Sequence, residues 1–174
     1  MLIGFASAAP FAIKDIELGM PPDAHPALEI EDHCRLLGFG TLLQCFSSKN
    51  LEIRTTIAGE TCGVVSLYFA NLAHHLEKAD WKSFHITFVC EGYQSTFDNL
   101  KRALVGKFGA PDHVETSYVK TIPWLYWYDG DFELALWNPP LNSEDPPEVW
   151  VLVNDKGLKE EREKLELRMR NEDI

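Results

Sequence analysis

The stretch of sequence that decides the fold is residues 124–137, which read WLYWYDGDFELALW. An Asp-Gly pair between two segments in which successive side chains alternate between two faces is a strong signal for a β-hairpin. We place a two-residue turn at Asp129-Gly130, between strands at about 124–129 and 132–138. This register pairs Tyr128 with Asp131, Tyr126 with Glu133, and Trp124 with Ala135.

Side chains of a strand alternate between its faces, so the two faces of this hairpin differ in composition. One is apolar and should join the core: Leu125, Trp127, Phe132, Leu134 and Leu136. The other combines aromatic rings with carboxylates around Ala135: Trp124, Tyr126, Tyr128, Asp131, Glu133 and Trp137. Large rigid aromatic groups with polar tips are enriched at binding hot spots. These six residues are therefore the candidate partner-binding surface, unless the rest of the chain or a second copy covers them.

The clearest helix of the chain spans residues 94–108. Gly109 and Pro111 follow it and supply a C-terminal cap and a stop. Its apolar residues recur at helical spacing and form one stripe: Phe97, Leu100, Leu104 and Phe108. We expect this stripe to pack on the apolar face of the hairpin.

Period-two alternation predicts further half-buried antiparallel strands. They fall at about residues 51–57, 62–70, 84–90, 114–121 and 148–154. The proline-rich stretch 139–147 cannot be a central strand and should form an exposed loop. The sequence therefore predicts the α+β class, an antiparallel sheet with helices on one face.

The order of these elements suggests a tandem of two helix-plus-meander modules. Residues 1–15 are a signal-peptide remnant or an N-terminal strand, and residues 16–92 form the first module, with a helix at about 22–37. Residues 93–155 form the second module, and residues 156–174 form a highly charged C-terminal helix. In that last helix Glu160 with Lys164, and Glu166 with Arg170, have the favourable i, i+4 order.

Several short motifs carry a resemblance to known families. They are the IELGM entry at residues 16–20, the helix exit at KFGAP, and the strands WLYWYDGD, ELALW and VWVLVND. The chain resembles the helix-plus-sheet repeats of β-lactamase-inhibitor proteins and of small outer-membrane-assembly lipoproteins, and small exported proteins of Gram-negative bacteria. No lipoprotein cysteine stands near the start, so no lipid anchor is implied. The resemblance implies a protein-binding module that uses the open face of its sheet.

Four cysteines are present, an even number compatible with two disulfides in an oxidising compartment. The candidates are Cys34, Cys45, Cys62 and Cys90. If Phe69 of one strand pairs with Ser83 of the next, Cys62 lies directly opposite Cys90, and Cys34 with Cys45 would be the second pair. In a reducing compartment the same four would be buried thiols.

Ala6-Ser7-Ala8 matches a signal-peptidase site, so we expect a periplasmic or secreted protein, with the cytoplasm as the alternative.

Composition narrows the function classes. A formal net charge of −11 repels nucleic-acid phosphate, so direct nucleic-acid binding is not expected. No apolar run is long enough for a membrane span. No phosphate-binding loop, nucleophile elbow or zinc motif is present, and the six histidines are not spaced as ligands. We therefore expect neither a metal nor another cofactor, and no enzyme of a motif-defined class.

Three functional hypotheses remain. The first is a small non-catalytic protein, exported in view of its N-terminus, that binds another protein through the aromatic and acidic sheet face. The second is a cytoplasmic acidic inhibitor of the phage type, whose carboxylates imitate nucleic-acid phosphates and block a host factor. The third is an enzyme with a site assembled from scattered residues. A homodimer is an alternative cover for the same face.

Overall fold

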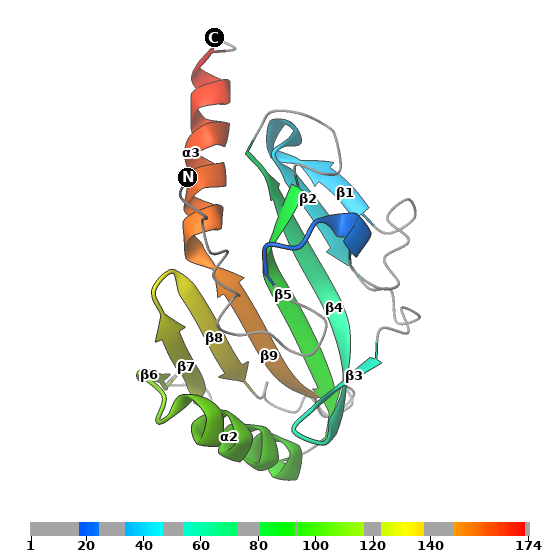
Figure 1. The fold of residues 1–174 in the computed structure, drawn as a ribbon, viewed down its shortest axis with the longest axis vertical. Coiled ribbons are helices and arrows are strands. Elements are labelled where there is room, and N and C mark those ends of the chain that lie inside the picture. Colours follow the sequence, from blue (N-terminus) through cyan, green and yellow to red (C-terminus); the bar gives the residue numbers. More distant parts are fainter. Residues whose placement is uncertain are drawn as a thin grey trace, which may run out of the picture.

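One antiparallel sheet contains every strand of the computed structural model, which describes residues 18–24, 34–46, 54–72, 81–92, 94–116, 123–137 and 148–172 (Figure 1). The strands of these segments are β1 (Cys34–Leu37), β2 (Leu42–Phe46), β3 (Arg54–Ile57), β4 (Glu60–Asn71), β5 (Trp81–Glu91), β6 (His113–Glu115), β7 (Trp124–Asp129), β8 (Phe132–Trp137) and β9 (Glu148–Asp155). The helices are α2 (Gln94–Phe108) and α3 (Lys156–Glu172), with 3-10 turns η1 (Pro22–Ala24) and η2 (Gly38–Gly40). The expected α+β class with an antiparallel sheet is confirmed.

The strand order is β1-β2-β4-β5-β9-β8-β7-β6, with β3 also paired to β4. Strand β9 lies between β5 and β8, so both halves of the chain contribute to one continuous sheet (Figure 1). The helix expected at about 22–37 is wrong at its end, because residues 34–37 form β1. Only residues 22–24 of that range form a helical turn, and residues 25–33 lie outside the described part of the chain.

Strands β4 and β5 form the longest pairing and contain two compensating irregularities. Cys62 pairs with Cys90 and Phe69 with Ser83, as expected. Between these points one bulge adds Val65 to β4 and a second adds Phe84 to β5, so the two shifts cancel over the length of the ladder. Both disulfides that the sequence suggested are formed: Cys62–Cys90 between these strands and Cys34–Cys45 between β1 and β2.

The register of the β7–β8 hairpin differs from the expected one by two residues. The turn is centred on Gly130-Asp131, and the observed pairs are Asp129 with Phe132, Tyr128 with Glu133, and Tyr126 with Ala135. Gly130 has a φ of 58°, and a positive φ at the first central residue alone is typical of a type II′ turn. A shift of two residues keeps every side chain on its face, whereas a shift of one would have exchanged the faces.

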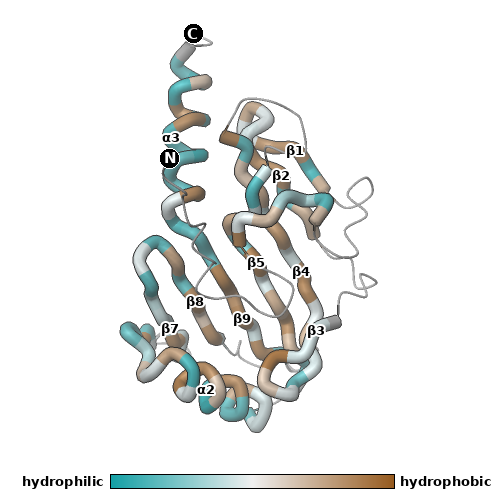
Figure 2. The backbone as a smooth tube through the Cα atoms, viewed as in Figure 1, coloured by the Kyte–Doolittle hydropathy of each residue, from teal (hydrophilic) through white to brown (hydrophobic). Residues whose placement is uncertain are grey.

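The core lies on the sheet face that α2 covers, here called the core face. Leu100 is fully buried and Trp127 is 1% exposed, in one cluster with Phe97, Leu104, Leu125, Leu134 and Leu136. Phe108 and Phe132 pack against the same cluster. The Trp127 indole Nε1–H donates to the carbonyl of Gly109, at 3.0 Å, which ties the hairpin to the end of α2. Figure 2 shows apolar and polar residues alternating along α2, as one covered and one solvated side require.

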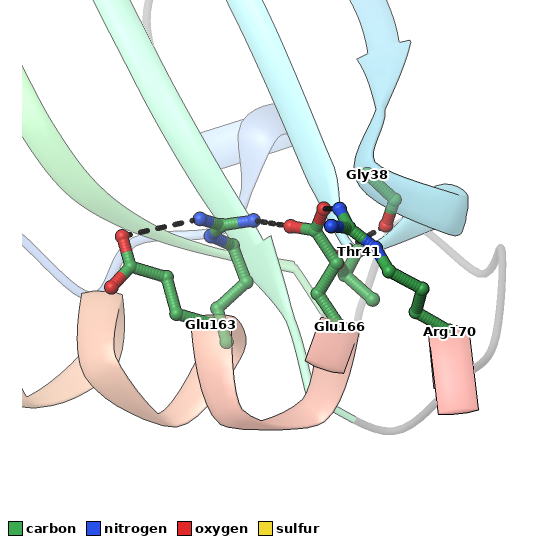
Figure 3. A network of polar contacts seen from close by, with 6 residues as sticks. Gly38, Thr41, Glu163, Glu166 and Arg170 are labelled. Atoms are coloured by element: carbon green, nitrogen blue, oxygen red, sulfur yellow. Dashed lines mark hydrogen bonds and ion pairs between the residues drawn. The ribbon is translucent and has the colours of Figure 1, made fainter. Parts of the chain in front are cut away.

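Helix α3 begins directly after β9. Asp155 caps it, because its Oδ1 accepts a hydrogen bond of 2.9 Å from the backbone N–H of Leu158. Further along, Arg162 donates to Glu166 at 2.6 Å, and Glu166 also pairs with Arg170 at 3.2 Å. The Glu166 carboxylate lies close to Gly38 of the η2 turn, where a side chain would come within 2.9 Å of its Oε2 (Figure 3). The expected pair of Glu160 with Lys164 is present at 3.6 Å.

We expect Leu104→Ala to lower the free energy of unfolding by about 2–5 kcal/mol, because it opens a cavity between α2 and the hairpin. Urea denaturation measures this. Val105 is the matched control, since it lies one residue further along α2 and is exposed. Val105→Ala should change stability by no more than about 0.5 kcal/mol. Equal effects of the two substitutions would contradict the packing of α2 on β7 and β8.

Titration of the native, unreduced protein should find almost no reactive thiol. Removing the Cys62–Cys90 bridge by a double Ala substitution should cost about 3–4 kcal/mol, and removing Cys34–Cys45 slightly less, because its loop is shorter. The sequence separations are 28 and 11 residues. Denaturation under non-reducing conditions compares the two. Four reactive thiols in native protein would exclude both bridges.

Candidate functional site: an aromatic ladder on the outer face of the sheet

Five aromatic side chains lie next to one another on the sheet face opposite α2, here called the outer face. They form what we name the aromatic ladder: Trp124, Tyr126 and Tyr128 of β7, Trp137 of β8 and Trp150 of β9. All are half-buried except Tyr128, which is 41% exposed. Strand alternation places them there, because the intervening residues Leu125, Trp127 and Leu136 point into the core.

Four of the five rings of the ladder are nearly parallel, and Trp150 is the exception. Trp124 stacks on Trp137 across the strands with a centroid distance of 4.6 Å and an interplanar angle of 8°. Along β7, Trp124 and Tyr126 are 5.9 Å apart at 9°, and Tyr126 and Tyr128 are 6.3 Å apart at 7°. Trp150 meets Trp137 edge-on at 5.5 Å. Such stacking fixes the rings against one another and holds their exposed edges in place.

The sequence brought four of these five rings into the candidate surface but missed Trp150. The sequence pattern could have placed Trp150 on the outer face, because Val149, Val151 and Val153 point into the core and side chains alternate along a strand. The structure places the predicted Trp124, Tyr126, Tyr128 and Trp137 in one contiguous group. Glu133 lies beside Tyr128, its partner across the strands.

Asp131, the remaining predicted residue, lies in the turn and is directed to the start of α3. Its backbone oxygen accepts a hydrogen bond of 2.8 Å from the N–H of Lys156. A side chain at Gly157 would come within 3.0 Å of the Asp131 carboxylate. The absence of a side chain at Gly157 allows this close approach. Asp131 therefore helps to attach α3 to the hairpin.

Carboxylates border the ladder on two sides. The Tyr126 hydroxyl donates to Glu115 Oε2 of β6 at 3.1 Å. The Trp150 indole Nε1–H donates to Glu148 Oε2 at 3.1 Å. Burial, reinforced by the Glu115 hydrogen bond and charge, raises the pKa of Tyr126 to about 12. The phenol is therefore neutral at physiological pH and remains the donor.

A chain of polar contacts continues from the ladder across β8, β9 and β5. Lys156 Nζ lies 2.8 Å from Glu133 Oε2, and Asn154 Nδ2 donates to Glu133 Oε1 at 2.9 Å. The side-chain amide oxygen Oδ1 of Asn154 pairs with His85 Nδ1. Since that oxygen accepts, Nδ1 carries the proton, and His85 Nε2 accepts from the Thr87 hydroxyl at 2.7 Å.

His85 is held as a neutral imidazole. Its ring stacks on Tyr68 of β4 with a centroid distance of 4.5 Å. Burial lowers the pKa of His85 below its usual 6.5, and the positive charge of Lys159 acts in the same direction. The Asn154 hydrogen bond and the Glu133 charge oppose this shift without reversing it.

Within the described residues, no three His, Cys, Asp or Glu side chains are grouped so that they could hold a metal. Among the helices of those same segments, none combines the length and apolar character that crossing a membrane requires.

Comparison with known proteins identifies no family for the chain. No protein-family model matches it, and no curated protein matches it either. Among solved structures, a DUF4309 family protein, YjgB from Bacillus subtilis subsp. subtilis str. 168, is similar with a TM-score of 0.30 and 16% sequence identity. The match covers 52% of this chain and 57% of that protein.

We expect the free energy of unfolding to fall as the pH is lowered through about 6.5, because His85 then takes up a proton in the unfolded chain and remains neutral in the folded chain. The stability is fully present above that pH and declines towards the lower folded-state pKa. Urea denaturation between about pH 7.5 and about pH 5.5 measures the slope. His85→Gln should reduce this slope, and an unchanged slope would show that His85 does not cause it.

Proposed function

We propose that this chain is a non-catalytic binding protein whose aromatic ladder contacts another protein. The observation that carries the proposal is the position of the ladder. Five large aromatic side chains gather on the face opposite the one that carries the core cluster and α2. Partly exposed aromatic groups that lie together in this way commonly mark interaction sites.

The chemistry of the ladder fits a hot spot. Each ring is rigid, so little conformational entropy is lost on binding, and each Tyr or Trp offers a polar tip to a partner. The ladder residues belong to β7, β8 and β9, each of which is paired with a strand on both sides, so the sheet positions them before a partner arrives. The resemblance of the sequence to β-lactamase-inhibitor-like helix-plus-sheet repeats agrees with a protein partner on the open sheet face.

The two disulfides support a place for this protein in an oxidising compartment. Such bonds persist in secreted and periplasmic proteins and are rare in the cytosol. Cys45, Cys62 and Cys90 are buried, so these bridges are part of the folded core. We therefore favour an exported binding protein over a cytoplasmic inhibitor.

Tyr126→Ala and Trp124→Ala should each weaken partner binding by about 2 kcal/mol or more, because each removes a ring from the middle of the ladder. The immobilised protein captures the partner from an extract of the source organism, and calorimetry with the purified partner then gives the affinity. Phe39→Ala is the control, since Phe39 is an exposed aromatic residue of the η2 turn, outside the ladder.

Two results would contradict the proposal. If Tyr126→Ala and Trp124→Ala unfold the protein, the ladder is internal core. If Phe39→Ala weakens binding as much as they do, the ladder has no special role. Sedimentation of the free protein identifies the remaining case, in which a second copy of the chain covers the ladder.

A further inference from the structure

Glu115 and Tyr126 form a pair of carboxylate and aromatic ring at the edge of the ladder. The Tyr126 hydroxyl occupies one acceptor position of Glu115, at 3.1 Å, and a carboxylate has about four such positions. Glu115 is exposed on β6, the edge strand of the sheet, and lies opposite Trp124. Its carboxylate thus retains capacity to accept from a cation that approaches the Tyr126 ring from the hydroxyl end, since His113 of β6 lies beside the same ring, with the centroids 5.8 Å apart.

The neighbouring pair already holds a cation, supplied by this chain. Lys156 Nζ lies 2.8 Å from Glu133 Oε2 and 4.5 Å from the centroid of the Tyr128 ring. An ammonium group in this position gains from both the carboxylate and the negative face of the ring. The rings of Tyr126 and Tyr128 are nearly parallel and 6.3 Å apart. The Tyr128 pair therefore shows which ligand chemistry the Tyr126 pair can accept.

The carboxylates around the ladder also favour a positively charged ligand. Glu115, Glu133 and Glu148 border the rings from three different strands, in a chain of net charge −11. An apolar partner would remove water from these carboxylates without replacing its hydrogen bonds, which is costly. A basic partner can pair with the exposed carboxylate of Glu115, and the acidic field would also accelerate its association.

We propose that the aromatic ladder binds a basic segment of another protein, with a Lys or Arg side chain of that segment over the Tyr126 ring beside Glu115. This inference rests on the proposed function and names the chemistry of the partner. Lys156 occupies the adjacent position over Tyr128, so it competes with a second basic side chain of the bound segment.

The five tryptophans make a residue-specific test available. Trp124, Trp137 and Trp150 belong to the ladder, whereas Trp81 and Trp127 are buried in the core. A hexalysine peptide is titrated into the full chain labelled with ¹⁵N, at about 0.15 M salt, and the indole N–H signals are followed by NMR. The Trp124 signal should shift, those of Trp81 and Trp127 should stay, and a hexaglutamine peptide should shift none.

Charge variants separate the site from the general acidity of the chain. Glu115→Gln should weaken hexalysine binding about five- to tenfold, because it removes the carboxylate beside Tyr126. Glu161→Gln makes the same change of charge on the exposed side of α3 and should alter binding less than about twofold.

Lys156 gives a test in the opposite direction. Lys156→Ala should strengthen hexalysine binding, because it vacates the position between Tyr128 and Glu133. Lys164→Ala removes the same charge from α3, where the Lys164 side chain is 72% exposed, and should have a smaller effect. Equal effects of the two lysine substitutions would mean that net charge alone explains the gain, against this inference.

The inference is overturned if Glu115→Gln and Glu161→Gln weaken binding equally, or if hexalysine leaves the Trp124 signal unmoved. The proposed function is judged separately, by Tyr126→Ala with the captured partner. A loss of partner binding in Tyr126→Ala, together with none in Glu115→Gln, would retain the ladder as a protein-binding surface and reject the basic segment as its ligand.

Discussion

The pairing of β5 with β9 is the interaction on which the rest of the structure depends. It joins the strands that precede α2 to those that follow it, over seven residue pairs from His85 with Asn154 to Glu91 with Glu148. Without these backbone hydrogen bonds the chain would form two smaller sheets, each with exposed edges. The same pairing sets Phe88 opposite Val151 in the middle of the core, where both are fully buried.

That register also determines the outer face. Because side chains alternate, the valines of β9 that enter the core leave Trp150, Leu152 and Asn154 on the other side of the strand. Asn154 is thereby brought to His85, and Trp150 to Trp137. Any slip of one residue between β5 and β9 would bury these groups and expose the valines, so the stability of the core specifies the composition of the candidate binding face.

Features of the fold with a local cause could be predicted from the sequence. The stripe of α2 and the two faces of the hairpin follow from helical and strand periodicity, and the two disulfides were suggested by the spacing of Cys62 and Cys90 along neighbouring strands. The hairpin turn was placed one residue early, because Asp-Gly was taken as the central pair although Gly130 prefers the first central position of a type II′ turn.

Other features depend on contacts between distant residues and were missed. Gly38 follows residues 34–37, and a glycine at this position suits a helix end and a hairpin turn equally. The pairing of β1 with β2 and the Cys34–Cys45 bridge favour the hairpin. No local pattern places Lys156 over Tyr128, since that contact depends on where β9 ends next to β8. Four of the five rings could therefore be predicted from the sequence, whereas the position of the Lys156 ammonium group over Tyr128 is visible only in the tertiary structure.

The start of α3 connects this cation to the stability of the fold. The N–H of Lys156 donates to the Asp131 oxygen in the hairpin turn, while Asp155 caps the helix one residue earlier. The backbone of Lys156 is thus fixed at both sides, whereas its side chain is 46% exposed. The flexible side chain can leave Glu133 without any change in α3, at a cost limited to one partly exposed ion pair and one ring contact. A basic segment whose second basic side chain takes the position over Tyr128 therefore displaces a side chain, and need not displace a helix.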